Sequence, residues 1–270
     1  MDSNAITAIA TVFLVIVGVQ QIRILHLQHR QLQLTLIEGY RTQWREIREH
    51  YASLVFIGRN SNEYYQLLDE KDLNLLRKNT AEASLSKPTV WALDAAKAFF
   101  PLLSTISQKI LQNELSVSDV YSLFGTEFLR HCRPIRVLLQ QDYHQYYPDS
   151  DQKHQRIRSE IQGWLIYHDG IRRRSLILID LLWAEAARLE DLPPEDLASA
   201  AIAKLKTGRM NKKRLLEEAN RLDHRFSIHV HRLMRFLNHA ELSRFGSRRG
   251  LKKQRLTKLY KEWENRLLNR

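Results

Sequence analysis

AITAIATVFLVIVGV, residues Ala5–Val19, carries no charged side chain, and the predicted fold and topology of the chain depend on this apolar run. A helix needs about 20 predominantly apolar residues to cross the hydrocarbon core of a bilayer. The run is shorter than that, so a span must also recruit Gln20–Leu25, whose one charge, Arg23, lies near enough to the end to reach the headgroups. We therefore predict a transmembrane anchor over residues 1–25.

A cleaved signal peptide and a buried helix of a soluble protein are the alternatives to an uncleaved anchor. The residues before the apolar run, MDSN, hold no Lys or Arg, whereas a signal peptide opens with a positively charged region. The arginines that follow the run are Arg23, Arg30, Arg41, Arg45 and Arg48. Because positive residues stay on the cytoplasmic side, we predict a single-pass protein of a bacterial inner membrane, with its N-terminus outside and the bulk of the chain in the cytoplasm.

The composition favours helices over strands. The 270 residues include only 9 Gly and 6 Pro, and the chain is rich in Leu, Gln, Arg, Glu and Ala, which favour helices. The single cysteine, Cys132, cannot form an intramolecular disulfide and is expected to be a core residue in a reducing compartment. The predicted fold class is all-α: one N-terminal transmembrane helix, followed by a cytosolic multi-helix bundle with a long helical stem.

Breaker residues divide the chain after the anchor. Leucines recur among glutamines in residues 26–58, so the anchor helix is expected to continue as an amphipathic or coiled-coil stem through which two copies could associate. The cluster Gly58–Asn62 ends the stem. The Tyr146–Asp151 loop then separates a helical subdomain at residues 59–147 from a second one at 148–270, which carries the basic C-terminal segment.

Caps and prolines place the next helices. We predict a helix over Glu63–Lys78 capped by Ser61. A core helix follows, which begins with Ser86–Pro88 and is kinked at Pro101. The apolar residues of this core helix recur at helical spacing and are Val90, Leu93, Ala96, Phe100, Leu103 and Ile110.

Further helices are expected after the core helix. Ser116 begins a helix that Pro134 bends or ends. The segment Gln155–Leu189 keeps helical spacing in spite of its two glycines, and its Leu-rich part, Leu176–Trp183, is predicted to be buried. A long helix is predicted over Asn211–Phe245.

The excess of positive charge lies at the C-terminal end. Residues 204–270 hold 20 Lys and Arg against 6 Asp and Glu, whereas the whole chain holds 42 against 30, so the remainder is close to neutral. On the Asn211–Phe245 helix several arginines fall within one stripe at about 100° per residue, and a basic turn follows. The predicted anion-binding residues are Arg214, Arg221, Arg225, Arg232, Arg235, Arg248, Arg249, Lys252, Lys253 and Arg255.

Three interpretations of this basic surface stay open. The first is a solvated face with local ion pairs, because Glu217 lies four residues before Arg221 and Glu218 four after Arg214. The second is attraction to anionic lipid headgroups, because the anchor holds the domain near a negatively charged leaflet. The third is nucleic acid, since arginine pairs with phosphates, although the chain has no recognised nucleic-acid motif.

No catalytic residue, cofactor site or metal site is predicted. His229 and His231 are two residues apart and point to different faces of a helix, and the chain has no HExxH arrangement. Asp180 and Glu185 are expected to pair with Arg172–Arg174 or with another helix rather than to form a catalytic pair. Neither a Gly-rich phosphate loop nor a GxSxG elbow occurs.

Two blocks within residues 91–130, WALDAAKAFF and VYSLFGTEFLR, carry a resemblance when they are taken together with the anchor and the Gln/Arg-rich stem. This layout resembles uncharacterised bacterial membrane-anchored helical proteins, some of which are labelled phage abortive-infection proteins. The resemblance implies an anchored all-helical chain and identifies no functional residue. The leading hypothesis is a binding, scaffold or regulatory module that meets anionic lipid or an acidic partner. The alternative is a nucleic-acid-binding or enzymatic effector in phage defence.

Overall fold

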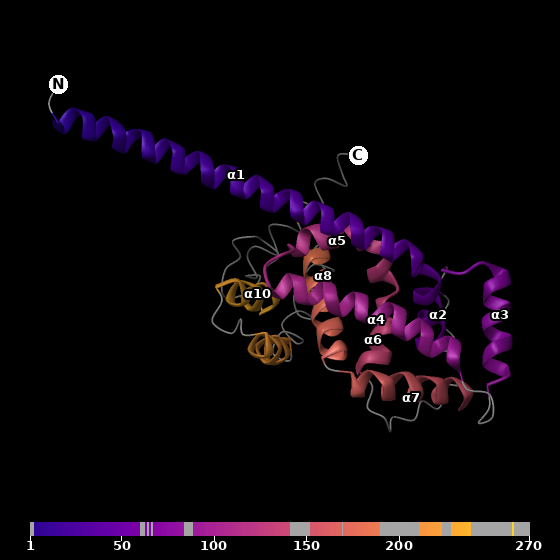
Figure 1. Ribbon diagram of the computed structural model, residues 1–270. Coiled ribbons are helices and arrows are strands. Elements are labelled where there is room, and N and C mark those ends of the chain that lie inside the picture. The colour runs from indigo at the N-terminus through magenta and orange to yellow at the C-terminus, as the bar shows by residue number, and fades with distance from the viewer. Residues whose placement is uncertain are drawn as a thin grey trace. The chain divides into compact units, whose positions relative to one another are not determined.

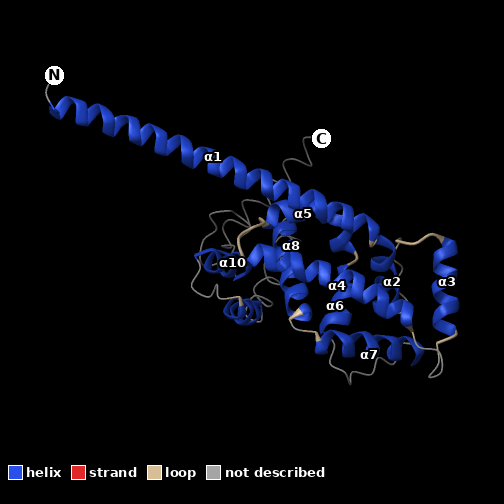
Figure 2. Cartoon of the chain, viewed as in Figure 1, coloured by secondary structure: helices blue, strands red, loops and turns tan. Residues whose placement is uncertain are grey.

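The computed structural model of the chain shows an all-helical protein (Figure 2). It describes residues 3–59, 63, 65, 67–83, 89–140, 152–168, 170–189, 211–222, 228–238 and 261. Within these ranges there is no strand, which confirms the predicted all-α class. The chain divides into two compact units, residues 1–43 and 44–270. Three predicted features lie outside the described residues, namely Ser61, Ser86–Pro88 and the Tyr146–Asp151 loop.

Helix α1, Ser3–Glu46, covers the described part of the first unit and is long and apolar enough to cross a membrane (Figure 1). Its exposed large apolar side chains near the N-terminus are Val12, Phe13, Leu14, Val15, Ile16, Val17 and Val19. At 1.5 Å per residue, its 44 residues extend roughly 66 Å. The hydrocarbon core of a bilayer is about 30 Å thick, so a bilayer can hold only about half of this helix.

The predicted stem is interrupted. Helix α1 ends at Glu46, and α2 (Arg48–Gly58) begins after the single residue Ile47. The expectation of one unbroken helix through residues 26–58 is therefore wrong. Most of α2 from Tyr51 onward is buried, so this helix belongs to the core of the second unit. A Cβ at Gly58 would lie 2.3 Å from the carbonyl oxygen of Pro134, so the close approach of these two backbones requires glycine.

Helix α3 spans Glu70–Ala81 rather than the predicted Glu63–Lys78. Its N-cap is Asp69, whose carboxylate accepts a hydrogen bond from the backbone nitrogen of Asp72 at 2.8 Å. The prediction of Ser61 as the cap is wrong for this helix. Asp and Ser are equally good capping residues, so residue type alone does not favour Ser61 over Asp69.

The central helices confirm the predicted cap at Ser116, whereas the prediction that Pro134 bends or ends the helix begun by Ser116 is wrong, because that helix ends at Arg130. Helix α4 (Val90–Leu111) continues through Pro101 and buries Ala96, Phe100, Leu103 and Ile110, while Val90 is exposed. Helix α5 (Val117–Arg130) begins after the predicted cap Ser116, whose hydroxyl accepts a hydrogen bond from the backbone nitrogen of Asp119 at 3.1 Å. Helix α6 (Cys132–Gln140) carries Pro134 in its first turn, where proline is tolerated because the backbone nitrogens there have no helical partner.

An aromatic cluster lies at the centre of the second unit. The ring centroid of Trp44 lies 5.1 Å from that of Tyr51 and 4.9 Å from that of Phe124. Tyr51 also stacks on Phe99 at 5.3 Å, and its hydroxyl donates a hydrogen bond to the carbonyl oxygen of Phe128 at 3.1 Å. These centroid distances lie in the favourable range for aromatic pairs, so the cluster joins α2, α4 and α5.

The segment predicted as one helix over Gln155–Leu189 forms two. Helix α7 spans Gln152–Tyr167 and α8 spans Ile171–Leu189. Between them Gly170 has φ +71°, a left-handed conformation that glycine adopts without strain. Helix α8 is buried from Ser175 to Leu182 and packs most extensively against α4 (Figure 1), which confirms the predicted burial of the Leu-rich part except at Trp183, which is exposed.

The basic region also differs from the single helix predicted over Asn211–Phe245. One helical segment covers residues 211–221 and ends in a turn at Leu222, and α10 (Ile228–Asn238) is a separate element. The predicted stripe of arginines is therefore divided between two helices. Several predicted anion-binding residues lie outside the described residues: Arg225, Arg248, Arg249, Lys252, Lys253 and Arg255.

Candidate anion-binding site

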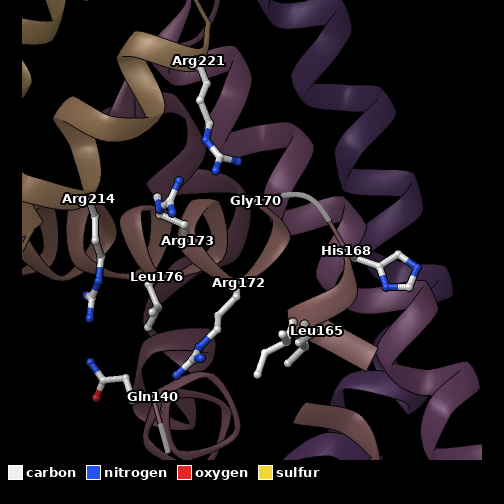
Figure 3. Close-up of a pocket in the computed structure, with 10 residues that line it drawn as sticks. Gln140, Leu165, His168, Gly170, Arg172, Arg173, Leu176, Arg214 and Arg221 are labelled. Atoms are coloured by element: carbon white, nitrogen blue, oxygen red, sulfur yellow. The ribbon is translucent and has the colours of Figure 1, made fainter. Parts of the chain in front are cut away.

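A pocket of about 650 Å³ opens where α6, α7, α8 and the 211–221 helix meet (Figure 3). This volume lies within the range of small-molecule binding sites in proteins. Its lining residues are Gln140, Leu165, Ile166, His168, Gly170, Arg172, Arg173, Leu176, Arg214 and Arg221. Four of them are arginines and none is acidic, so the described wall of the pocket is strongly positive.

The turn at Gly170 brings the arginines of α8 into place. A Cβ at this position would lie 2.8 Å from Nη1 of Arg174 and 3.1 Å from Oε1 of Glu218. Glycine therefore leaves room for this ion pair, in addition to allowing the left-handed backbone. Three arginines follow at the start of α8, and successive helical residues diverge by about 100°, so their side chains leave the helix in different directions.

Glu218 is the buried anchor for two of these arginines. Its Oε1 lies 2.7 Å from Nη1 of Arg174, and its Oε2 lies 3.3 Å from Nη1 of Arg173. Arg173 is also within 3.4 Å of Glu217, which is half-exposed. Nε of Arg174 donates to Oγ of Ser104 on α4 at 2.6 Å. One carboxylate, both of whose oxygens are paired, thus fastens the 211–221 helix to α8, and Arg174 in turn links α8 to α4.

Asp180 is the second buried carboxylate in this region. Arg136 on α6 donates a hydrogen bond to its Oδ1, and Nη1 of Arg214 lies 3.7 Å from its Oδ2. Burial raises the pKa of Asp180, and the charges of Arg136 and Arg214 oppose that rise. The pKa of Arg214 is lowered, first by burial and then, against the attraction of Asp180, by the charges of Arg136, Arg172 and Arg173.

Arg172 has a different environment from its neighbours. Its Nε donates a hydrogen bond to the backbone carbonyl of Leu139 at the end of α6. Within the described ranges, the ion pairs of this region join Arg173, Arg174 and Arg214 to carboxylates and do not include Arg172. Arginine carries five N–H donors, so the contact with Leu139 fixes the direction of the guanidinium and uses only one of them.

The sequence predicted part of this site. Arg214 and Arg221 were expected to bind anions, and both line the pocket. Arg232 is exposed on α10 and is not among the lining residues, and the side chain of Arg235 is not described. Arg172 and Arg173 were missed, although three consecutive arginines that begin two residues after Gly170 were a usable signal of positive charge gathered at a helix start.

The other candidate sites have structural explanations among the described residues. Asp180 was expected to pair either with Arg172–Arg174 or with another helix, and it pairs with Arg136 and Arg214 on other helices. Arg173 and Arg174 pair with Glu218. His229 Nε2 lies 2.6 Å from the carbonyl oxygen of Ile110, and no group of three metal-binding side chains is found in the described ranges.

Cys132 is fully enclosed in the second unit. The thiol is free and buried, and burial raises its pKa well above the ordinary value. Its sequence neighbours His131 and Arg133 therefore do not make it a reactive thiolate. The prediction of a buried core cysteine is confirmed.

Comparison with known proteins gives no relative from which a function can be transferred. No protein-family model, no curated protein and no solved structure matches the chain. The resemblance carried by residues 91–130 stays a prediction.

Proposed function

We propose that the chain is a single-pass membrane protein whose second unit, residues 44–270, works as a binding or regulatory module for an anionic partner at the membrane surface. The observation that carries the proposal is the exposed apolar run of α1. Its large side chains from Val12 to Val19 are between 49% and 72% exposed. Burying a large apolar side chain is worth about 1.5–3 kcal/mol, so leaving this run in water forgoes roughly 10 kcal/mol, comparable to the stability of a whole domain.

The orientation follows from the arginines beyond the run. Arg23 and Arg30 are exposed on α1, and more arginines follow toward its C-terminal end. Positive residues flanking a span favour the cytoplasmic side. The proposed topology is therefore an N-terminus outside a bacterial inner membrane and a second unit inside the cell, next to an anionic leaflet.

Anionic lipid headgroups are the partner that this placement favours. Each Lys or Arg near an anionic membrane surface contributes about 1 kcal/mol of attraction. The C-terminal surplus of positive charge and the arginine-lined pocket lie in the same unit. Lipid binding through this unit would add to an anchor that already fixes the chain at the membrane.

The anchor is tested by extracting membranes that contain the full chain with high salt, alkaline carbonate and detergent. We expect release by detergent alone, and we expect Leu14→Arg to shift the protein to the soluble fraction because a charge at the centre of a span is costly. Leu32→Arg is the matched control, since Leu32 lies on the exposed part of the same helix beyond the predicted span. Release of the unaltered chain by salt would refute the anchor.

Topology and lipid contact need separate measurements. Protease added to spheroplasts should spare the second unit, and protease added to inverted vesicles should digest it; the reverse pattern would contradict the proposed orientation. For lipid contact, the full chain is reconstituted into phosphatidylcholine with or without phosphatidylglycerol. Trypsin, which cuts after Lys and Arg, should cleave the basic unit more slowly in the anionic membrane, and added salt should remove the difference. Equal cleavage rates would exclude lipid headgroups as the partner.

A further inference from the structure

From the pocket geometry we infer that it is a specific site for a phosphate monoester, held by Arg172, Arg173, Arg214 and Arg221, with the remainder of the ligand against an apolar wall. The inference deepens the proposed function, on which it rests, because it names the anion that the second unit takes. The shared chemistry covers a free phosphorylated metabolite and a phosphomonoester lipid headgroup.

The arginines come from two helices and face one space. Arg172 and Arg173 lie in the first turn of α8, whereas Arg214 and Arg221 lie on the 211–221 helix. Figure 3 shows the side chains of Arg172 and Arg214 directed toward Gln140, and those of Arg173 and Arg221 directed toward each other. Guanidinium groups approaching from different directions suit a tetrahedral anion, and each can form two parallel hydrogen bonds with phosphate oxygens.

Buried carboxylates orient two of the pocket arginines, because Glu218 pairs with Arg173 and Asp180 pairs with Arg214. Six arginines either line the pocket or pair with the carboxylates Asp180 and Glu218 beside it, namely Arg136, Arg172, Arg173, Arg174, Arg214 and Arg221. The described carboxylates paired with members of this set are Asp180, Glu217 and Glu218. After burial, the charges of Arg136, Arg172 and Arg173 lower the pKa of Arg214, and a bound dianion would relieve their repulsion.

The size and the lining of the pocket favour a ligand larger than a bare ion. About 650 Å³ is far more than phosphate alone fills. Leu165, Ile166 and Leu176 form an apolar part of the wall beside the arginines. A ligand with a charged head and an apolar or aromatic body satisfies both parts, which is the composition of a phosphate monoester of an organic alcohol.

The test uses the full chain in phosphatidylcholine nanodiscs and isothermal titration with phenyl phosphate, inorganic phosphate and benzoate. Phenyl phosphate should bind saturably and more tightly than the other two. Its affinity should fall as the pH drops below about 6, where the monoester loses its second charge. Absence of saturable phenyl phosphate binding, or equal binding of benzoate, would overturn the inference.

Matched variants locate the binding. The double variant Arg172→Gln with Arg221→Gln should weaken phenyl phosphate binding about tenfold or more, because each charge-assisted hydrogen bond contributes substantially to affinity. The control pair Lys71→Gln with Lys212→Gln removes the same charge from exposed positions that do not line the pocket, and should change affinity less than about twofold. Equal loss in both pairs would show attraction to net charge and would refute a specific site.

Two further variants protect the test from misfolding. Arg221→Gln alone alters an exposed side chain, so its affinity can be measured even if the Arg172 variant is unstable. Arg172→Lys keeps the charge and loses the paired donors of the guanidinium. It should still weaken binding severalfold, with the melting temperature near that of the unaltered chain, and undiminished affinity in both variants would refute the assignment.

Lipid and free ligands are separated by the disc composition. Phosphatidic acid in the disc should compete with phenyl phosphate if a lipid headgroup reaches the pocket, and phosphatidylglycerol, a phosphodiester, should not. Unchanged affinity in both discs assigns the site to a free metabolite, and either result supports the phosphomonoester chemistry. If only this inference fails, the chain is still extracted by detergent alone and is still protected from trypsin in anionic membranes. If the proposed function fails, these two results are lost as well.

Discussion

Replacing the buried Glu218 by glutamine should destabilise the second unit more than removing a charge from its surface. The side chain of Glu218 is 1% exposed and pairs with Arg174 at 2.7 Å and with Arg173 at 3.3 Å. The glutamine side chain is nearly the same size but cannot compensate the charge of Arg174, most of which is buried. Removing one partner of a buried ion pair costs about 3–5 kcal/mol.

The partial exposure of Arg173 and its second partner Glu217 reduce this cost, so we expect about 3 kcal/mol, the lower end of the range for a buried pair. For a unit of this size that corresponds to a melting temperature roughly 6–12 °C lower. Thermal unfolding of the full chain in detergent, followed by tryptophan fluorescence, measures it.

Glu217→Gln is the matched control, because it removes the same charge from the neighbouring residue. Glu217 is 42% exposed and lies 3.4 Å from Arg173 and 4.0 Å from Lys213. Exposed pairs of this kind contribute at most about 1 kcal/mol. The double variant Arg174→Gln with Glu218→Gln should be less destabilised than the sum of its two parts, since it buries no unpaired charge. Equal melting temperatures of the Glu217 and Glu218 variants would show that burial of Glu218 does not set the cost.

Three further predictions concern single residues. Gly170→Ala should destabilise the fold more than Gly125→Ala, because both glycines have positive φ but only Gly170 has Arg174 and Glu218 within reach of a new Cβ. The melting temperatures of the two variants test this, and an equal decrease in both would contradict the predicted clash at Gly170. The thiol of Cys132 should react with a disulfide reagent only after urea unfolds the chain, and fast native labelling would contradict its burial. Burial raises the pKa of Asp180 above 3.8, so the folded state holds its proton more tightly and loses stability as the pH rises through that raised pKa. The decrease in the free energy of unfolding with rising pH should be smaller in Asp180→Asn, as measured by urea unfolding at several pH values. The same pH dependence in both proteins would refute this prediction.

Helical periodicity was sufficient for the parts of the fold that depend on local pattern. The core face of α4 was readable from apolar residues at helical spacing, and the cap at Ser116 was readable from residue type alone. The buried stretch of α8 was likewise visible as a run of leucine and isoleucine. In each case the residues that define the element lie within a few turns of one another.

The interruptions depended on contacts between distant residues. Nothing local at Ile47 requires a break; α2 separates from α1 where Tyr51 and its neighbours enter the aromatic core. Gly170 was visible as a glycine, yet glycine also occurs within helices, and its left-handed conformation serves an ion pair between Arg174 and Glu218. Periodicity carries no information about such partners, which is why one helix was predicted where two exist.

The site shows the same limit in its charges. In the sequence, Glu218 lies four residues after Arg214 and suits a local helical pair. In the structure it turns to Arg173 and Arg174 on α8, and Arg214 pairs with Asp180 instead. An exposed helical pair is worth a few tenths of a kcal/mol, far less than the cost of leaving a buried carboxylate unpaired, so the pairing between helices prevails.

This exchange of partners changes where the positive field is strongest. Counting along the chain assigns the whole surplus to residues 204–270, yet half of the pocket arginines, Arg172 and Arg173, come from a segment outside it. The buried carboxylates Asp180 and Glu218 hold arginines of both segments at fixed positions around one cavity. A field that is focused by low-dielectric walls binds an anion more selectively than the same charges spread over a solvated face. Local concentration of guanidinium groups, rather than net charge, therefore decides whether this chain distinguishes one anion from another.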